Sequence, residues 1–94
     1  MSESTIERNI REFVEKKGGL CIKLQNLTTR GFPDRTILFP RGLILFMEVK
    51  DGKKGNVSRH QRTWRRALML MGFPCVTVKS LQEAITEIER HCAI

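Results

Sequence analysis

The fold is decided by one stretch, residues 31–50, which reads GFPDRTILFPRGLILFMEVK. Two apolar runs flank a turn at residues 40–42 (Pro-Arg-Gly), residue types that favour chain reversal, so the stretch predicts a β-hairpin. The second run is apolar on both of its alternating faces, which is typical of a central strand. Charges stand at the strand ends, although burying an unpartnered charge is costly. These charged residues are Asp34, Glu48 and Lys50.

The turn determines which residues of the hairpin face each other. If residues 40–42 form the loop, antiparallel partners have numbers that sum to about 82, which places Asp34 opposite Glu48. A bulge would shift this pairing by one residue, and a longer turn would let it slip. Lys50 follows Glu48 by two positions, so both side chains lie on one face. Paired carboxylates roughly 4.5–5.5 Å apart at Cβ repel unless a cation lies between them, so a divalent-metal site is predicted.

The rest of the chain alternates between helical and strand patterns. Apolar residues recur at helical spacing before the Gly18-Gly19 pair, and Ser58 with Gln61 forms a second helix start of the capping-box type. We expect loops at 25–32 and 51–56. The expected elements are a helix from residue 4 or 5 to the glycine pair, strands at 20–24, 36–39 and 43–50, a helix at 58–71, a strand at 74–78 and a last helix from residue 80. This αβββαβα order predicts an α/β fold with a central mixed sheet flanked by helices.

Length and composition place the chain among small globular proteins. Its 94 residues, 40% apolar and 29% charged, predict a single domain spanning residues 1–94. The longest apolar run is strand-sized and the first residues are polar, so we expect a cytoplasmic protein without a membrane span. Three cysteines in apolar surroundings indicate buried, reduced thiols, and their spacing does not favour zinc.

The charge balance is strongly basic. Lys and Arg number 17 against 10 Asp and Glu, which gives a net charge of +7 and a pI near 9.9. An excess of positive charge favours polyanionic partners such as nucleic acid, although it is also compatible with solubility alone. The region 51–66 contains all six candidate DNA-binding residues, and no aromatic platform for base stacking accompanies them. These candidates are Lys53, Lys54, Arg59, Arg62, Arg65 and Arg66.

Each candidate site residue also has a local explanation. Asp34 is a natural turn residue, and Glu48 with Lys50 fits an exposed ion pair at a sheet edge. Glu7 lies on the margin of the first helix, where it either leans over the hairpin end or completes a capping box with Ser4. Gln61 is likewise the expected capping-box residue of its helix. The joint placement of three charges at one end of one hairpin favours the site over these separate explanations.

The motifs resemble a known family. Pro33-Asp34 followed by Glu48-Val49-Lys50 resembles the PD-(D/E)XK nuclease motif, and the glycine turn before it and Gln61 after it resemble the VRR-nuclease domain in its small stand-alone phage and prophage form. The resemblance covers most of the chain and implies a Mg²⁺- or Mn²⁺-dependent phosphodiesterase. It implies metal binding by Asp34, Glu48 and the Val49 carbonyl, a catalytic role for Lys50, a metal contact from Glu7 directly or through water, and a site-orienting role for Gln61.

The resemblance also implies a partner and an assembly. Small members of this family resemble Holliday-junction resolvases, which act as homodimers on branched DNA. Met69 and Leu70 fall on or beside the basic helix face, where a partner subunit would cover them. The chain is thus expected to be a metal-dependent DNA endonuclease. The alternative is a non-catalytic basic DNA-binding or interaction module of a repair or restriction complex.

Overall fold

The computed structural model describes residues 2–24, 30–50 and 57–92. The elements follow one another in the order αβββαβα, as the sequence predicts. They are α1 (Glu3–Lys16), β1 (Leu20–Ile22), β2 (Arg35–Phe39), β3 (Leu43–Val49), α2 (Arg59–Leu70), β4 (Cys75–Val78) and α3 (Leu81–Cys92).

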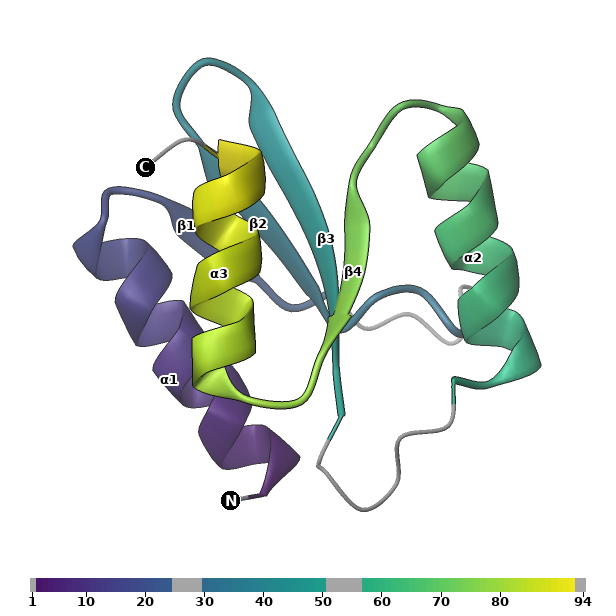
Figure 1. The fold of residues 1–94 in the computed structure, drawn as a ribbon, viewed down its shortest axis with the longest axis horizontal. Coiled ribbons are helices and arrows are strands. Elements are labelled where there is room, and N and C mark those ends of the chain that lie inside the picture. Colours follow the sequence, from purple (N-terminus) through teal and green to yellow (C-terminus); the bar gives the residue numbers. More distant parts are fainter. Residues whose placement is uncertain (1, 25–29, 51–56, 93–94) are drawn as a thin grey trace.

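The strands form one mixed sheet in the order β1-β2-β3-β4 (Figure 1). β1 and β3 both pair antiparallel with β2, whereas β4 pairs parallel with β3. β3 therefore has a partner on each side, which confirms the prediction of a central strand. A parallel pair requires a crossover connection, and α2 supplies it between β3 and β4.

The two faces of the sheet are covered by different helices. α1 and α3 lie side by side on one face (Figure 1), where their apolar stripes meet the sheet. This side holds the larger core, in which Ile10 and Val14 of α1 and Ile88 of α3 are fully buried. The helical spacing of these residues is what aims them at the sheet.

α2 covers the other face near β3 and β4. Its Leu68 packs with Phe46 and Cys75 in a second, smaller core to which Phe32 and Phe73 contribute aromatic contacts. The apolar residues Ala67 and Met71 of this helix are exposed. Only a narrow strip of α2 meets the sheet, and Leu68 is the residue of that strip that becomes buried.

Several predicted boundaries shift. α1 begins at Glu3, because the Ser2 hydroxyl caps it by accepting the Thr5 N–H at 3.2 Å. β1 ends at Ile22 rather than Leu24. β1 is an edge strand, and alternating apolar residues do not mark where pairing with its one neighbour stops. The other strands and α2 lie within one residue of their predicted limits, and the loop predicted at 51–56 lies outside the described residues.

Candidate active site

The register of the hairpin brings the two predicted carboxylates together. All observed β2–β3 partners have numbers that sum to 82, from Phe39–Leu43 to Arg35–Met47. Asp34 lies one residue before β2, and its Oδ2 accepts a hydrogen bond from the Val49 backbone N–H at 2.8 Å. The predicted register therefore holds as far as Arg35, the first residue of β2, and Asp34 is fixed against the backbone at the end of β3.

Glu48 is buried beside Asp34. Glu48 is only 6% exposed. Its pKa is raised to about 8, first by burial, then by the charge of Asp34 and by a side-chain hydrogen bond with Asp34. Lys50 opposes this shift, with its Nζ 4.0 Å from Glu48 Oε1. The local explanation of an exposed edge pair is wrong, since Glu48 is buried and its strand is central. Two neighbouring carboxylates are suitable ligands for a hard divalent cation, which would also relieve the repulsion between them.

Gln61 combines the two roles that the sequence left as alternatives. Its Oε1 accepts the Ser58 N–H at 2.9 Å while its backbone N–H donates to the Ser58 hydroxyl, which completes the capping box of α2. The Nε2 of the same side chain donates to Glu48 Oε1 at 2.6 Å. The residue that caps the start of α2 therefore also orients the Glu48 carboxylate.

Glu7 is buried on α1 but has other partners. Its Oε1 accepts a hydrogen bond from Arg35 Nε at 2.9 Å and lies 4.0 Å from Lys23 Nζ. It therefore does not form the capping box with Ser4. Within residues 2–24, 30–50 and 57–92, no group of three or more His, Cys, Asp or Glu side chains is arranged to hold a metal ion, so Glu7 stands apart from the Asp34–Glu48 pair. A metal contact from Glu7 stays a prediction.

Arg35 is the partner that sequence reasoning missed. It directly follows Asp34, and strand alternation sends the two side chains to opposite sides of β2. Asp34 is thereby available to Glu48 while Arg35 reaches Glu7 on α1. An Arg next to a motif aspartate was visible in the sequence, but its partner depends on where α1 packs.

The chain segment before Asp34 is held against α2. Gly31 has a φ of +89°, and a Cβ added there would lie 2.5 Å from the His60 backbone carbonyl carbon. Only glycine fits such a close approach without strain. The neighbouring Phe32 ring contacts Trp64 with a centroid distance of 5.1 Å, and the Trp64 indole N–H donates to the Arg30 carbonyl. These contacts position Asp34 from the α2 side.

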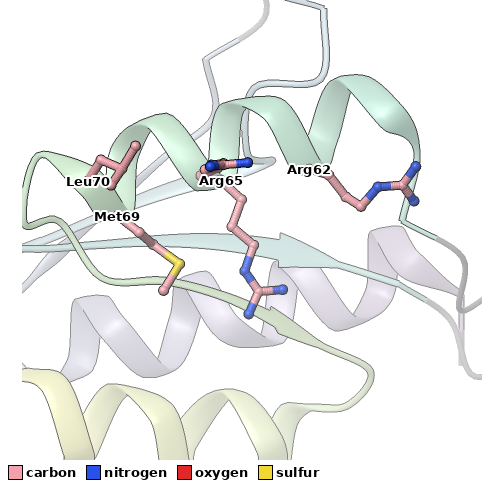
Figure 2. A pocket seen from close by; sticks show the side chains of 5 residues that line it. Arg62, Arg65, Met69 and Leu70 are labelled. Atoms are coloured by element: carbon pink, nitrogen blue, oxygen red, sulfur yellow. The ribbon is translucent and has the colours of Figure 1, made fainter.

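The predicted basic face lies on α2, and its Arg65 lines a small pocket together with Glu48. Arg59, Arg62 and Arg66 are exposed, whereas Arg65 is half-buried. A groove runs along this part of the helix (Figure 2), and Met69 and Leu70, 53% and 79% exposed, line it together with three of the arginines. The remaining two candidates, residues 53 and 54, lie outside the described part of the chain. The groove thus joins cationic and apolar groups on one helix.

Fold and site together define a small α/β domain of the PD-(D/E)XK type, with an Asp and a Glu-x-Lys motif at the end of a central hairpin. No family model matches the chain. A solved structure of a VRR_NUC domain superposes on it with a TM-score of 0.85 and 29% sequence identity, over 95% of this chain and 96% of that chain. The resemblance to the VRR-nuclease domain is therefore confirmed.

A second comparison concerns sequence. The "Putative nuclease p44" of Acyrthosiphon pisum secondary endosymbiont phage 1 is 40% identical over 48 residues, which are 51% of this chain and 52% of that protein. The match thus covers about half the length of this curated relative. It agrees with the structural comparison in supporting the resemblance drawn from the motifs.

Proposed function

We propose that this chain is a divalent-metal-dependent nuclease that hydrolyses DNA phosphodiester bonds. The observation that carries the proposal is the convergence of Asp34, Glu48, Lys50 and Gln61 at one end of the β2–β3 hairpin. The names of the similar proteins, a VRR_NUC domain and a phage nuclease, support it.

The donor set suits Mg²⁺ or Mn²⁺. Asp34 and Glu48 offer carboxylate oxygens, and the Val49 carbonyl, next to the N–H that holds Asp34, would complete the protein ligands. When bound, such an ion lowers the pKa of a water molecule and stabilises negative charge on a phosphoryl oxygen. Glu7 would contribute from α1 directly or through water, after exchanging its Arg35 partner.

Side chains of the protein would provide the other functions of the site. Lys50, whose Nζ is 4.0 Å from Glu48, donates hydrogen bonds that orient the attacking water and offset charge on the phosphate in the transition state. Gln61 fixes the rotamer of Glu48, so the carboxylate does not have to reorganise as charge develops. The arginines of α2 bind the DNA backbone beside the site.

We further propose that the enzyme is a homodimer selective for branched DNA such as Holliday junctions. The chain extends 32 × 32 × 22 Å, so one copy cannot place a site on two strands of a four-way junction. Met69 and Leu70 are exposed apolar residues that a second copy would cover. The phage origin of the p44 relative supports action in the cytoplasm of a bacterial host.

The deciding experiment is a cleavage assay on duplex, flap, nicked and four-way DNA with Mg²⁺ or Mn²⁺. Lys50→Ala should lower the single-turnover rate by at least about 100-fold, the effect of losing one preorganised donor, while the Kd for DNA changes little. Glu12→Gln, which changes an exposed residue on α1, serves as the control for activity lost during preparation of a variant. Undiminished cleavage in excess EDTA would contradict the proposal.

The alternative is a non-catalytic DNA-binding module, which the net charge of +7 favours. This alternative predicts metal-independent binding, no cleavage of any substrate, and little effect of Asp34→Asn. Both functions predict that binding weakens steeply with salt, so the cleavage panel and not the salt dependence separates them.

A further inference from the structure

Arg65 belongs both to the carboxylate site and to the groove on α2. It lines a small pocket together with Pro33, Glu48 and Gln61, and it also lines the groove that contains Met69. Figure 2 shows its side chain reaching away from α2 toward the sheet. Gln61 and Arg65 are four residues apart, so they share one helix face. α2 thus directs a neutral donor and a cation to the same side of the site.

Among the residues that the structure describes, the guanidinium of Arg65 has no acidic partner of the kind that other cations near the site have. Arg35 pairs with Glu7, and Lys50 lies 4.0 Å from Glu48. Throughout the ranges that the structure describes, no carboxylate oxygen lies within 4.0 Å of Arg65, whose Nη1 instead approaches the Thr77 hydroxyl at 3.5 Å. A half-buried guanidinium with one weak neutral contact retains most of its capacity to bind an anion.

The position of Thr77 ties Arg65 to the site. Thr77 is the residue of β4 that pairs with Glu48 of β3, so the two side chains stand next to each other on the sheet. Lys50 Nζ lies 4.0 Å from Glu48 Oε1, whereas among the described residues no carboxylate oxygen lies that close to Arg65, so Arg65 is set further from the carboxylates. An anion bound by Arg65 would therefore lie beside the metal site and not within it.

We infer that Arg65 binds the DNA phosphate next to the one that is cut, and that the cleaved strand leaves the site past the arginines of the α2 groove, while Met69 and Leu70 remain available to the second copy. The inference rests on the proposed nuclease function and adds the path of the substrate. Planar guanidinium groups bind phosphate oxygens in a bidentate manner, and the half-buried setting of Arg65 reduces competition from water. Arg62 precedes and Arg66 follows Arg65 on α2, and both line the same groove, so they would contact other phosphates of the same strand.

The test pairs a protein charge with a single substrate charge. The DNA is whichever panel substrate the wild type cuts, with one neutral methylphosphonate placed at each position around the mapped cut. In the wild type, the methylphosphonate one step from the cut should weaken DNA binding about 10- to 100-fold, the usual cost of losing a charge-assisted hydrogen bond. Arg65→Met should weaken binding of unmodified DNA by a similar factor.

Combining the two changes is the decisive measurement. In Arg65→Met, the methylphosphonate at that position should weaken DNA binding by less than about two-fold, because the guanidinium that would contact the phosphate is already absent. Methylphosphonates at other positions should still weaken binding as they do in the wild type. Arg65→Lys should retain part of the sensitivity, which a merely structural role would not predict. Arg11→Met, which removes an exposed charge on α1, should show the full sensitivity of the wild type. If Arg65→Met is as sensitive as the wild type at every position, the inference is wrong.

Failure of the nuclease proposal is distinguishable from failure of this inference. If the wild type cuts no substrate in the panel, the proposed activity fails and Arg65 is judged by binding alone. The slope of log Kd against log salt should then fall by about one in Arg65→Met, as expected for one lost phosphate contact, and remain unchanged in Arg11→Met. An unchanged slope in Arg65→Met overturns the inference.

Discussion

The Glu48→Gln substitution should stabilise the metal-free protein at neutral and alkaline pH. The pKa of Glu48 is raised from 4.5 to about 8, first by burial and then by Asp34. Because the folded-state pKa is the higher one, folding favours the protonated carboxyl, and this contribution is complete below pH 4.5 and lost as the pH rises through 8. Glutamine imitates the protonated form, since its oxygen can accept from Gln61 while its N–H group faces Asp34.

The size of the effect follows from the width of the pH window. One pKa unit corresponds to about 1.4 kcal/mol, so the wild type should lose up to about 4 kcal/mol relative to Glu48→Gln between pH 5 and pH 8. This is a large share of the roughly 5–15 kcal/mol by which small domains are stable. Urea unfolding in EDTA, followed by the fluorescence of the single Trp64, measures the difference. The two stability curves should meet near pH 5 and diverge above it.

Divalent metal should reverse the order of the two proteins. The wild type should gain stability with Mg²⁺ concentration through preferential binding to the folded state, whereas Glu48→Gln, having lost a carboxylate ligand, should gain little. Glu12→Gln, which changes an exposed carboxylate on α1, should follow the wild type throughout. Parallel pH profiles of the wild type and Glu48→Gln in EDTA would refute the reasoning, because they would mean that burial and Asp34 do not hold Glu48 in its neutral form.

Three further substitutions test the supports of the site. Gly31→Ala should cost more than about 3 kcal/mol in urea unfolding, because strain at φ +89° adds to a 2.5 Å clash, while Gly42→Ala, which has φ +72° and open space, should cost about 1–2 kcal/mol. Gln61→Glu keeps the cap but sets a carboxylate against Glu48, so cleavage should fall at least about 10-fold with unchanged circular dichroism. Arg35→Met leaves the buried carboxylate on α1 poorly paired and should lower the free energy of unfolding by about 3 kcal/mol, and a loss below 1 kcal/mol would show that the pair is dispensable.

The hairpin could be predicted from the sequence because its determinants are local. A short turn at 40–42 sets the register, and the alternation of the strands then decides which side chains share a face. Asp34, Glu48 and Lys50 were placed correctly relative to one another for this reason. The capping box of Gln61 was local as well, whereas its bond to Glu48 depends on the packing of α2 over β3.

Features that depend on the packing of separate elements were not predictable. Glu7 had a plausible local partner in Ser4, but its actual partner is Arg35, 28 residues away in the sequence. The contact forms because α1 packs near β2, and that packing depends on the whole core. The start of α1 was ambiguous for a related reason. Ser2, Ser4 and Thr5 are all residue types that can cap a helix. Which of the three becomes the N-cap depends on the geometry of the folded chain and not on any one of these residues alone.

The carboxylate site destabilises the end of the hairpin, and packing elsewhere in the fold offsets this cost. Two carboxylates at the end of a central strand oppose each other, and the fully buried Ile10, Val14 and Ile88 offset that cost from the opposite face of the sheet. The hairpin is also paired on both outer edges, so its register does not depend on the carboxylates being neutralised. A divalent ion would therefore enter a donor set that the fold already holds in place, and it would stabilise the folded state by relieving the repulsion between the two carboxylates.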